Sequence, residues 1–300
     1  MNHRKIARLL SLAALLLAVL FAFSACGKDD GGSDYSQTGG ESSSEAEPSS
    51  SAPSSSETSE TSSSEPTSDP SSDTSSEPEP VKAGLVPESD RADTSYFDDA
   101  VFVGDSVSLK LEYYDVDTGV MGNAKFLTSG SLGSNNALWE ISDESVHPSY
   151  QGEKKLIEDA VALTGAKKVY IMLGMNDIGA YGVDPSIESF KTLIGKILEK
   201  SPDVTIYAQS VTPKAEGTEW EDLNNTTITE YNQKLLAACE ENGWYYIDVA
   251  SAVMDENGFL PAEYCSDPEE MGMHFTEAGC QIWADYLYTH TAPAKGGAES

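Results

Sequence analysis

The chain has few basic residues, few cysteines and no long apolar run. Its 18 Lys and Arg stand against 50 Asp and Glu, which gives a formal net charge of -32. So acidic a chain repels phosphate backbones, and this argues against nucleic-acid binding. The 4 cysteines form no CxxC pair, which disfavours a zinc site, and the chain has no GxSxG segment of the α/β-hydrolase type.

The first 26 residues resemble a bacterial lipoprotein export signal. A basic start precedes an apolar run from Leu9 to Phe23, roughly 15 residues, whereas a spanning helix needs about 20. The run ends in Ser24-Ala25-Cys26, and small residues directly before a cysteine resemble a lipobox, although Phe23 stands where leucine is usual. We therefore expect residues 1–26 to be a lipoprotein signal, with Cys26 lipidated and the protein membrane-anchored at the bacterial cell surface. An ordinary signal peptide with an incidental cysteine is the alternative.

Composition divides the rest of the chain into three parts. Residues 27–82 consist mainly of Ser, Glu, Pro, Thr and Asp, and cannot bury enough apolar surface to offset the entropy of ordering. We expect this segment to be a disordered tether, residues 83–292 to form one folded domain, and residues 293–300 to be a flexible tail. Cys239, Cys265 and Cys280 lie in the domain; one disulfide among them and three buried thiols are both compatible with the sequence.

Apolar runs alternate with amphipathic stretches along the domain. The runs cover 100–103, 168–173, 204–208 and 244–249, and the helical patterns cover 154–163, 187–198, 228–239 and 277–288. This alternation predicts an α/β fold with a parallel sheet covered on both faces, in which functional sites form at the carboxyl ends of the strands. Two polar motifs, at 104–106 and 174–177, directly follow apolar runs.

Ser106 is the first candidate for chemistry, because it follows a strand-like run and begins a helical pattern. Its hydroxyl would lie at the rim of the sheet, beside helix N–H groups that can stabilise an oxyanion. A serine alone is a weak nucleophile and needs a base. His3 leaves with the export signal, His147 lies in a polar loop and His290 is near the C-terminus. His274, directly before the last helical pattern, is therefore the best-placed base.

Three segments together resemble blocks of the SGNH (GDSL-like) hydrolase family. They are Gly104-Asp105-Ser106-Val107, Gly174-Met175-Asn176-Asp177 and Gly272-Met273-His274-Phe275-Thr276, in the family's order. The resemblance implies a flavodoxin-like three-layer α/β/α sandwich with a five-stranded parallel sheet. It implies a serine esterase that uses no metal and no cofactor, with Ser106 as nucleophile and His274 as base.

The resemblance also implies an oxyanion hole made by the Ser106 N–H, a glycine N–H and the Asn176 side-chain amide. Gly133, which follows an apolar stretch, is the preferred glycine, and Gly130 is the alternative. Asp105 and Asp177, next to the catalytic blocks, are interpreted as structural supports of their loops.

One position departs from the family. Where the family has an aspartate three residues before the histidine, this chain has Met271, which cannot orient an imidazole. Residues 268–271 read as an insertion, and Asp267 is predicted to be the displaced orienting acid. A Ser–His dyad with a backbone carbonyl as orienting group is the alternative, and loss of the acid could lower turnover by about 10⁴-fold.

These observations predict an extracytoplasmic esterase that removes small acyl groups, such as acetyl, from carbohydrate or cell-wall polymers. The predicted partners are an acyl ester or acylated glycan and, through Cys26, the membrane. An O-acyltransferase, a lysophospholipase or thioesterase, and a non-catalytic glycan-binding lipoprotein remain alternatives. A two-lobed solute-binding lipoprotein would need a longer chain.

Overall fold

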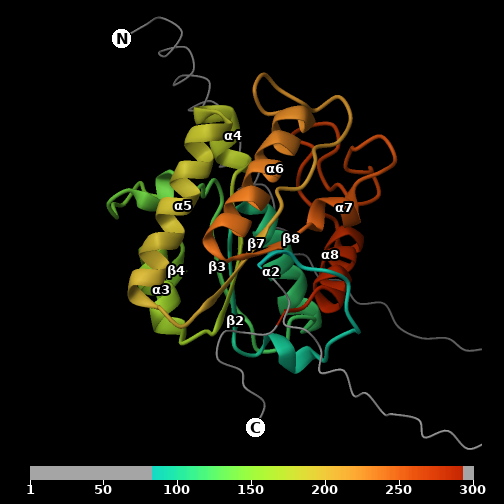
Figure 1. Ribbon diagram of the computed structural model, residues 1–300. Helices are drawn as coiled ribbons and strands as arrows, with labels where there is room; N and C mark the ends of the chain where they lie inside the picture. The colour runs from blue at the N-terminus through green and yellow to red at the C-terminus, as the bar shows by residue number, and fades with distance from the viewer. Residues whose placement is uncertain (1–82, 293–300) are drawn as a thin grey trace, which may run out of the picture. The chain divides into compact units, whose positions relative to one another are not determined.

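A six-stranded parallel sheet forms the centre of the computed structural model, which describes residues 83–292 (Figure 1). In spatial order the strands are β1 (Gly84–Leu85), β8 (Tyr245–Ile247), β7 (Thr205–Gln209), β6 (Lys168–Met172), β2 (Ala100–Gly104) and β3 (Lys125–Thr128). A separate antiparallel pair is formed by β4 (Ser149–Tyr150) and β5 (Glu153–Lys154).

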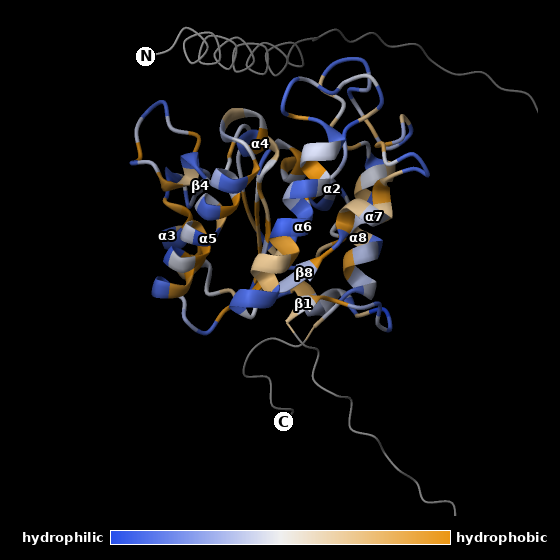
Figure 2. Ribbon diagram, turned by 45° about the horizontal axis from the view of Figure 1, so that its top comes forward, coloured by the Kyte–Doolittle hydropathy of each residue, from blue (hydrophilic) through white to orange (hydrophobic). Residues whose placement is uncertain are grey.

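Helices cover both faces of the sheet and give the predicted three-layer α/β architecture. One layer contains α3 (Ile157–Thr164), α4 (Met175–Tyr181), α5 (Val183–Lys200) and α6 (Asn225–Asn242). The other contains α2 (Ser106–Thr118), α7 (Val249–Val253) and α8 (Glu277–Thr289). Short 3₁₀ helices occur at η1 (Thr94–Phe97) and η2 (Asn136–Leu138). Buried apolar residues from the sheet and the helices form one core, and the ribbon in Figure 2 is coloured by the hydropathy of each residue.

The sheet holds a row of aromatic rings at one level. Phe126, Phe102, Tyr170, Tyr207 and Tyr245 occupy paired positions on five neighbouring strands. Successive ring centroids are 5.2, 4.9, 4.5 and 5.2 Å apart, with stacked geometry. A strand slipped by one residue would turn its ring to the opposite face, so this row fixes the register of the strands.

That register sets the position of the functional motifs. Gly104, the last residue of β2, pairs with Met172, the last residue of β6. Both motifs that follow these strands therefore emerge side by side at the carboxyl edge of the sheet, as parallel strands dictate.

The predicted strands and helices are confirmed with small shifts at their ends. The predicted five-stranded sheet is wrong by one strand, because β1 pairs with β8 at the edge. That strand has only two residues, and so short a segment carries no alternating pattern. Gly165 and Gly243 end α3 and α6 with φ of 68° and 74°, as expected of helix-terminating glycines.

The predicted signal, the lipidation site at Cys26, the tether and the tail lie outside the described residues. Within residues 83–292, no helix is both long enough and apolar enough to cross a membrane.

Candidate active site

Ser106 is the first residue of α2, and the residue before it caps that helix. Asp105 is buried and accepts a hydrogen bond from the Val107 N–H at 2.9 Å. Burial raises the pKa of Asp105 to about 6, although its hydrogen bond from Val107 and the charge of His274 act in the opposite direction. The cap fixes the first turn of α2, so the backbone N–H groups of that turn, which lack helical partners, face the end of β2.

Ser106, His274 and Asp267 form one hydrogen-bonded series. The Ser106 hydroxyl lies 2.9 Å from His274 Nε2, and His274 Nδ1 lies 2.7 Å from Asp267 Oδ2. An ionised carboxylate can only accept, so Nδ1 carries the hydrogen and Nε2 is the acceptor for the serine hydroxyl. Burial alone would raise the pKa of Asp267. The hydrogen bond with His274 and the positive charge of that imidazole outweigh burial, and they hold the pKa of Asp267 below its usual range.

The segment from Cys265 to His274, here called the histidine loop, shows how the insertion is accommodated. Its two ends pair: the Ser266 N–H donates to the His274 carbonyl at 2.7 Å, and Cys265 bridges to Phe275. The inserted residues form a closed turn in which the Glu270 and Gly272 N–H groups both donate to the Asp267 carbonyl. The insertion therefore bulges outward, and Asp267 stays opposite His274. Met271 makes no contact with the imidazole among the described interactions.

Asp267 also holds the backbone of the residue that it orients. Its Oδ1 accepts from the Met273 and His274 N–H groups, both at 3.1 Å. The Cys265 thiol lies 3.3 Å from the same oxygen. With one carboxylate oxygen on the backbone and the other on the ring, the imidazole has little freedom to turn.

Lys214 is a component of this region that sequence reasoning missed. Its side chain is buried, and its ammonium donates to the Met271 carbonyl inside the inserted turn. Burial lowers the pKa of Lys214, while the nearby charge of Asp267 acts in the opposite direction. The next residue, Ala215, donates its N–H to the Gly272 carbonyl at 2.7 Å. Both acceptors are backbone carbonyls far along the chain, so no sequence motif predicts the contacts of Lys214 and Ala215 with the inserted turn.

Residues 131–136, here called the oxyanion loop, lie beside Asn176. The Asn176 amide donates to the Leu132 carbonyl at 3.0 Å and lies 3.4 Å from Asp105 Oδ2. The Gly133 N–H donates to Asn136 Oδ1 at 2.8 Å. The structure thus brings Asn176 next to the residues that precede Ser106 and Gly133, but both predicted donors have internal acceptors.

Asp177 holds the oxyanion loop in place through hydrogen bonds to its backbone. It is 1% exposed, and it accepts from the Ser134 and Asn135 N–H groups at 2.6 and 3.0 Å. A Cβ atom at Gly133 would lie 2.7 Å from this carboxylate, whereas a Cβ at Gly130 would meet nothing within 4 Å. Of these two glycines, only Gly133 must be glycine for steric reasons, and its role as oxyanion donor stays a prediction.

The remaining candidates lie elsewhere in the domain. His147 lies in the loop before β4, as predicted, but it is buried, and its Nε2 lies 3.1 Å from the Ala137 carbonyl. His290 stacks on Tyr286 with ring centroids 3.6 Å apart. Cys239, Cys265 and Cys280 are buried free thiols. Within the described part of the chain, no group of three or more His, Cys, Asp or Glu could hold a metal ion.

Comparison with known proteins gives one family match. Residues 152–282 match the GDSL-like Lipase/Acylhydrolase family. This span contains Asn176, Asp267 and His274, and it ends within α8. No curated protein sequence matches the chain.

Solved structures that resemble part of this chain include a lipase and a carbohydrate esterase. A GDSL-like lipase from Bacteroides thetaiotaomicron is 18% identical, with a TM-score of 0.45 over 62% of this chain and 83% of the lipase. A carbohydrate esterase of family 3 from Talaromyces cellulolyticus is 19% identical, with a TM-score of 0.40 over 62% of this chain and 92% of the esterase.

The matched span contains His274 and Asp267, and hydrogen bonds join these two residues to Ser106, which lies before that span in the sequence. The chain is therefore a carboxylic ester hydrolase, and its residues 152–282 are similar to the GDSL-like lipase/acylhydrolase family.

Proposed function

We propose that the chain is a lipid-anchored, extracytoplasmic serine esterase that removes small acyl groups from carbohydrate or cell-wall polymers. The catalytic part of this proposal rests on two contacts. Ser106 Oγ lies 2.9 Å from His274 Nε2, and His274 Nδ1 lies 2.7 Å from Asp267 Oδ2. A serine hydroxyl donating to an imidazole, which a carboxylate orients, is the arrangement that activates serine for acyl transfer.

In the proposed mechanism, Ser106 Oγ attacks the ester carbonyl while His274 Nε2 takes the hydroxyl proton. The tetrahedral intermediate collapses when His274 returns this proton to the leaving alcohol oxygen, which leaves an acyl-serine. Water then attacks the acyl carbon, His274 takes its proton, and the second collapse releases the carboxylic acid and returns the proton to Ser106. Asp267 stays ionised throughout and stabilises the imidazolium form of His274.

The proposed oxyanion hole consists of the Ser106 N–H, the Gly133 N–H and the Asn176 amide. For Gly133 and Asn176, the oxyanion must replace the acceptors Asn136 Oδ1 and the Leu132 carbonyl. A developing negative charge accepts a stronger hydrogen bond than a neutral amide oxygen does, which favours this exchange in the transition state. Before the reaction, the internal acceptors satisfy donors that would otherwise be unpaired.

The location and substrate in this proposal come from the sequence outside the described domain. A basic start, a short apolar run and Cys26 support export and lipidation, and the acidic tether supports a domain held away from the membrane. A net charge of -32 disfavours anionic polymers, so neutral acylated glycans are the favoured substrates.

Hydrolysis of p-nitrophenyl acetate and butyrate by the full chain tests the proposal, with Ser106→Ala beside the wild type. We expect the wild type to hydrolyse both esters, with a preference for the acetate. In Ser106→Ala the rate should fall to background, and a fluorophosphonate should label the wild type alone. Equal inertness of the two proteins, without labelling, would contradict the catalytic role of Ser106. Incorporation of a radioactive fatty acid into the wild type, abolished in Cys26→Ala, tests the anchor separately.

A further inference from the structure

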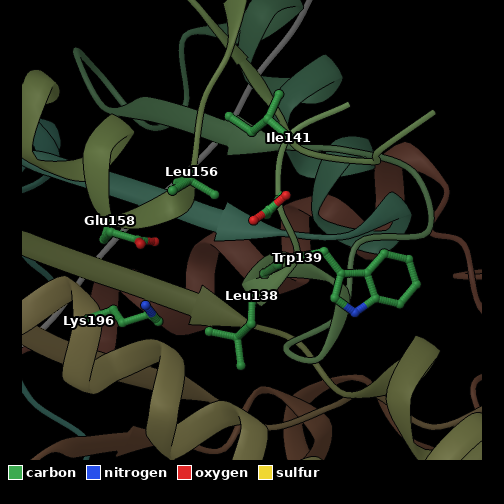
Figure 3. Close-up of a pocket in the computed structure, with 8 residues that line it drawn as sticks. Leu138, Trp139, Ile141, Leu156, Glu158 and Lys196 are labelled. Atoms are coloured by element: carbon green, nitrogen blue, oxygen red, sulfur yellow. The ribbon is translucent and has the colours of Figure 1, made fainter. Parts of the chain in front are cut away.

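A concave site lies beside the segment that follows the oxyanion loop. It is a pocket of about 380 Å³, where residues 137–141 pass the start of α3 and one side of α5 (Figure 3). Its size falls within the range of roughly 300–1,000 Å³ that is common for small-molecule sites. Its lining residues are Ala137, Leu138, Trp139, Glu140, Ile141, Leu156, Glu158 and Lys196. We call it the Trp139 pocket.

The pocket carries a large aromatic side chain on its rim. Trp139 is 53% exposed, and Ile141 beside it is also exposed. An exposed indole presents a flat, electron-rich face that attracts polarised C–H groups and other apolar surfaces, and its N–H can still donate a hydrogen bond. Trp139 therefore offers a stacking surface for a flat, partly apolar ring.

The pocket also contains a buried carboxylate with an unused oxygen. Glu158 is 4% exposed, and among the described residues no donor reaches its buried Oε2. Figure 3 shows this carboxylate directed into the pocket, on the side opposite Trp139. Buried acceptors in folded proteins almost always have partners, so this oxygen points to a ligand that brings a donor.

Stabilisation of α3 does not explain why Glu158 is buried. A carboxylate in the first turn of a helix interacts favourably with the helix dipole. Asp159 already occupies that turn, where it is paired with Lys200. Glu158 adds a second negative charge at the same end and loses its hydration.

The charges in the Trp139 pocket select among ligand classes. The lining contains two carboxylates, Glu140 and Glu158, and one ammonium, Lys196. Its net charge is therefore negative, and it would repel an anionic ligand. An alkyl chain would cover the apolar walls but leave Glu158 Oε2 without a donor. A neutral sugar ring brings hydroxyl donors for the carboxylates, hydroxyl oxygens for Lys196 and a C–H face for Trp139.

The pocket wall is continuous with the catalytic machinery. The Ala137 N–H donates to the Gly133 carbonyl at 3.0 Å, and the buried His147 ring contacts the Ala137 carbonyl. Local hydrogen bonds thus connect residues 131–139, from the proposed oxyanion donor Gly133 to Trp139.

We propose that the Trp139 pocket binds a neutral saccharide unit, with Trp139 stacking on the ring and Glu158 accepting from its hydroxyls. The saccharide binding stands by itself, whereas its role in holding an acylated glycan for Ser106 rests on the proposed function. Trp139 and Glu158 would then determine specificity for polymeric over small substrates.

Calorimetric titration of the full chain carrying Ser106→Ala tests the binding. The probes are neutral tetrasaccharides of glucose, xylose and N-acetylglucosamine, and dodecanoate serves as an alkyl probe. We expect at least one tetrasaccharide to bind, and Trp139→Ala and Glu158→Met each to weaken it at least tenfold. Tyr113→Ala, which removes an exposed aromatic side chain on α2 away from the pocket, should leave binding unchanged.

Thermal unfolding of Glu158→Met separates binding from a structural role. If the carboxylate is kept for a ligand, methionine should raise the Tm while it weakens saccharide binding, because it removes a buried carboxylate oxygen that has no hydrogen-bond donor. A lower Tm with unchanged binding would overturn the proposal. So would the absence of binding by all three tetrasaccharides, or binding of dodecanoate alone that Trp139→Ala abolishes.

Kinetics on two substrates then separate this proposal from the proposed function. On acetylated xylo-oligosaccharides, Trp139→Ala in the otherwise wild-type chain should raise KM at least tenfold, and kcat/KM on p-nitrophenyl acetate should stay the same. A wild type that hydrolyses p-nitrophenyl acetate but no acetylated saccharide would refute the proposed substrate class and leave the binding result intact. Equal loss on both substrates would overturn a specificity role for the pocket.

Discussion

The oxyanion loop and the histidine loop are held by the same device. In each, one aspartate accepts hydrogen bonds from two successive backbone N–H groups: Asp177 from Ser134 and Asn135, and Asp267 from Met273 and His274. The two carboxylates differ in what else they contact. Asp267 has a second oxygen on an imidazole, and no described interaction joins Asp177 to a cation.

This difference sets the two pKa values apart. Burial raises the pKa of Asp177 to about 6, although its backbone hydrogen bonds act in the opposite direction. For Asp267, the effect of burial is outweighed by the hydrogen bond with His274 and its charge, and the pKa lies below its usual range. Asp177 is also more deeply buried, at 1% exposed against 14% for the Asp267 side chain, so its deeper burial and the imidazole beside Asp267 together separate the two pKa values.

The sharpest test of the comparison is Asp267→Asn. We expect kcat on p-nitrophenyl acetate to fall by about 10⁴-fold, because an amide can present its NH₂ to His274 and favour the wrong tautomer. Glu269→Gln, an exposed neighbour in the inserted turn, is the matched control and should retain full activity. A loss of less than tenfold for Asp267→Asn would instead favour a Ser–His dyad.

The next largest effect is expected in the oxyanion loop. Gly133→Ala would place a methyl group 2.7 Å from the Asp177 carboxylate, so the loop must move and its N–H must change direction. The loss of one oxyanion donor typically lowers kcat by about 10²–10³-fold. Gly130→Ala, with open space around its Cβ position, should keep kcat within about twofold, since nothing there must move. Similar losses in the two variants would mean that the loop as a whole, and not Gly133, is sensitive.

The opposite pKa shifts predict opposite effects of pH on stability. For Asp177 the folded-state pKa lies above the unfolded value of 3.8, so the folded protein binds more protons and the free energy of unfolding falls as pH rises from about 4 to about 6. For Asp267 the folded-state pKa is lowered, so its contribution is present above the unfolded pKa and is lost as pH falls through the lower folded-state value.

Urea unfolding at pH 4.5 and 6.5 measures the first effect. From pH 4.5 to 6.5 the wild type should lose roughly 1–2 kcal/mol more than Asp177→Asn, which cannot ionise at this position. Asp105, whose pKa is also raised to about 6, remains in both proteins and largely cancels in the comparison. Parallel pH dependences would show that Asp177 titrates as an ordinary exposed carboxyl.

Sequence alone could predict those parts of the site that are carried by local motifs. Ser106, Asn176 and His274 each belong to a short block next to a strand or helix, and the structure places all three at one edge of the sheet. Asp267 is predicted as the orienting acid only if residues 268–271 are an insertion. The Gly133 N–H donates to the Asn136 side chain, and no residue pattern predicts whether that hydrogen bond forms.

Lys214 marks the limit of such prediction and gives the smallest expected effect. Its ammonium bonds to a backbone carbonyl 57 residues further along, and any residue at 271 would supply that acceptor. Lys214→Met would leave the Met271 carbonyl without its donor and loosen the turn that keeps Asp267 opposite His274. We expect kcat to fall roughly tenfold with KM unchanged, because small misplacement of a catalytic group is costly. Lys167→Met, on an exposed side chain, should change neither. Full activity of Lys214→Met would mean that the paired ends of the histidine loop, Ser266 with His274 and Cys265 with Phe275, hold Asp267 without help from the insertion.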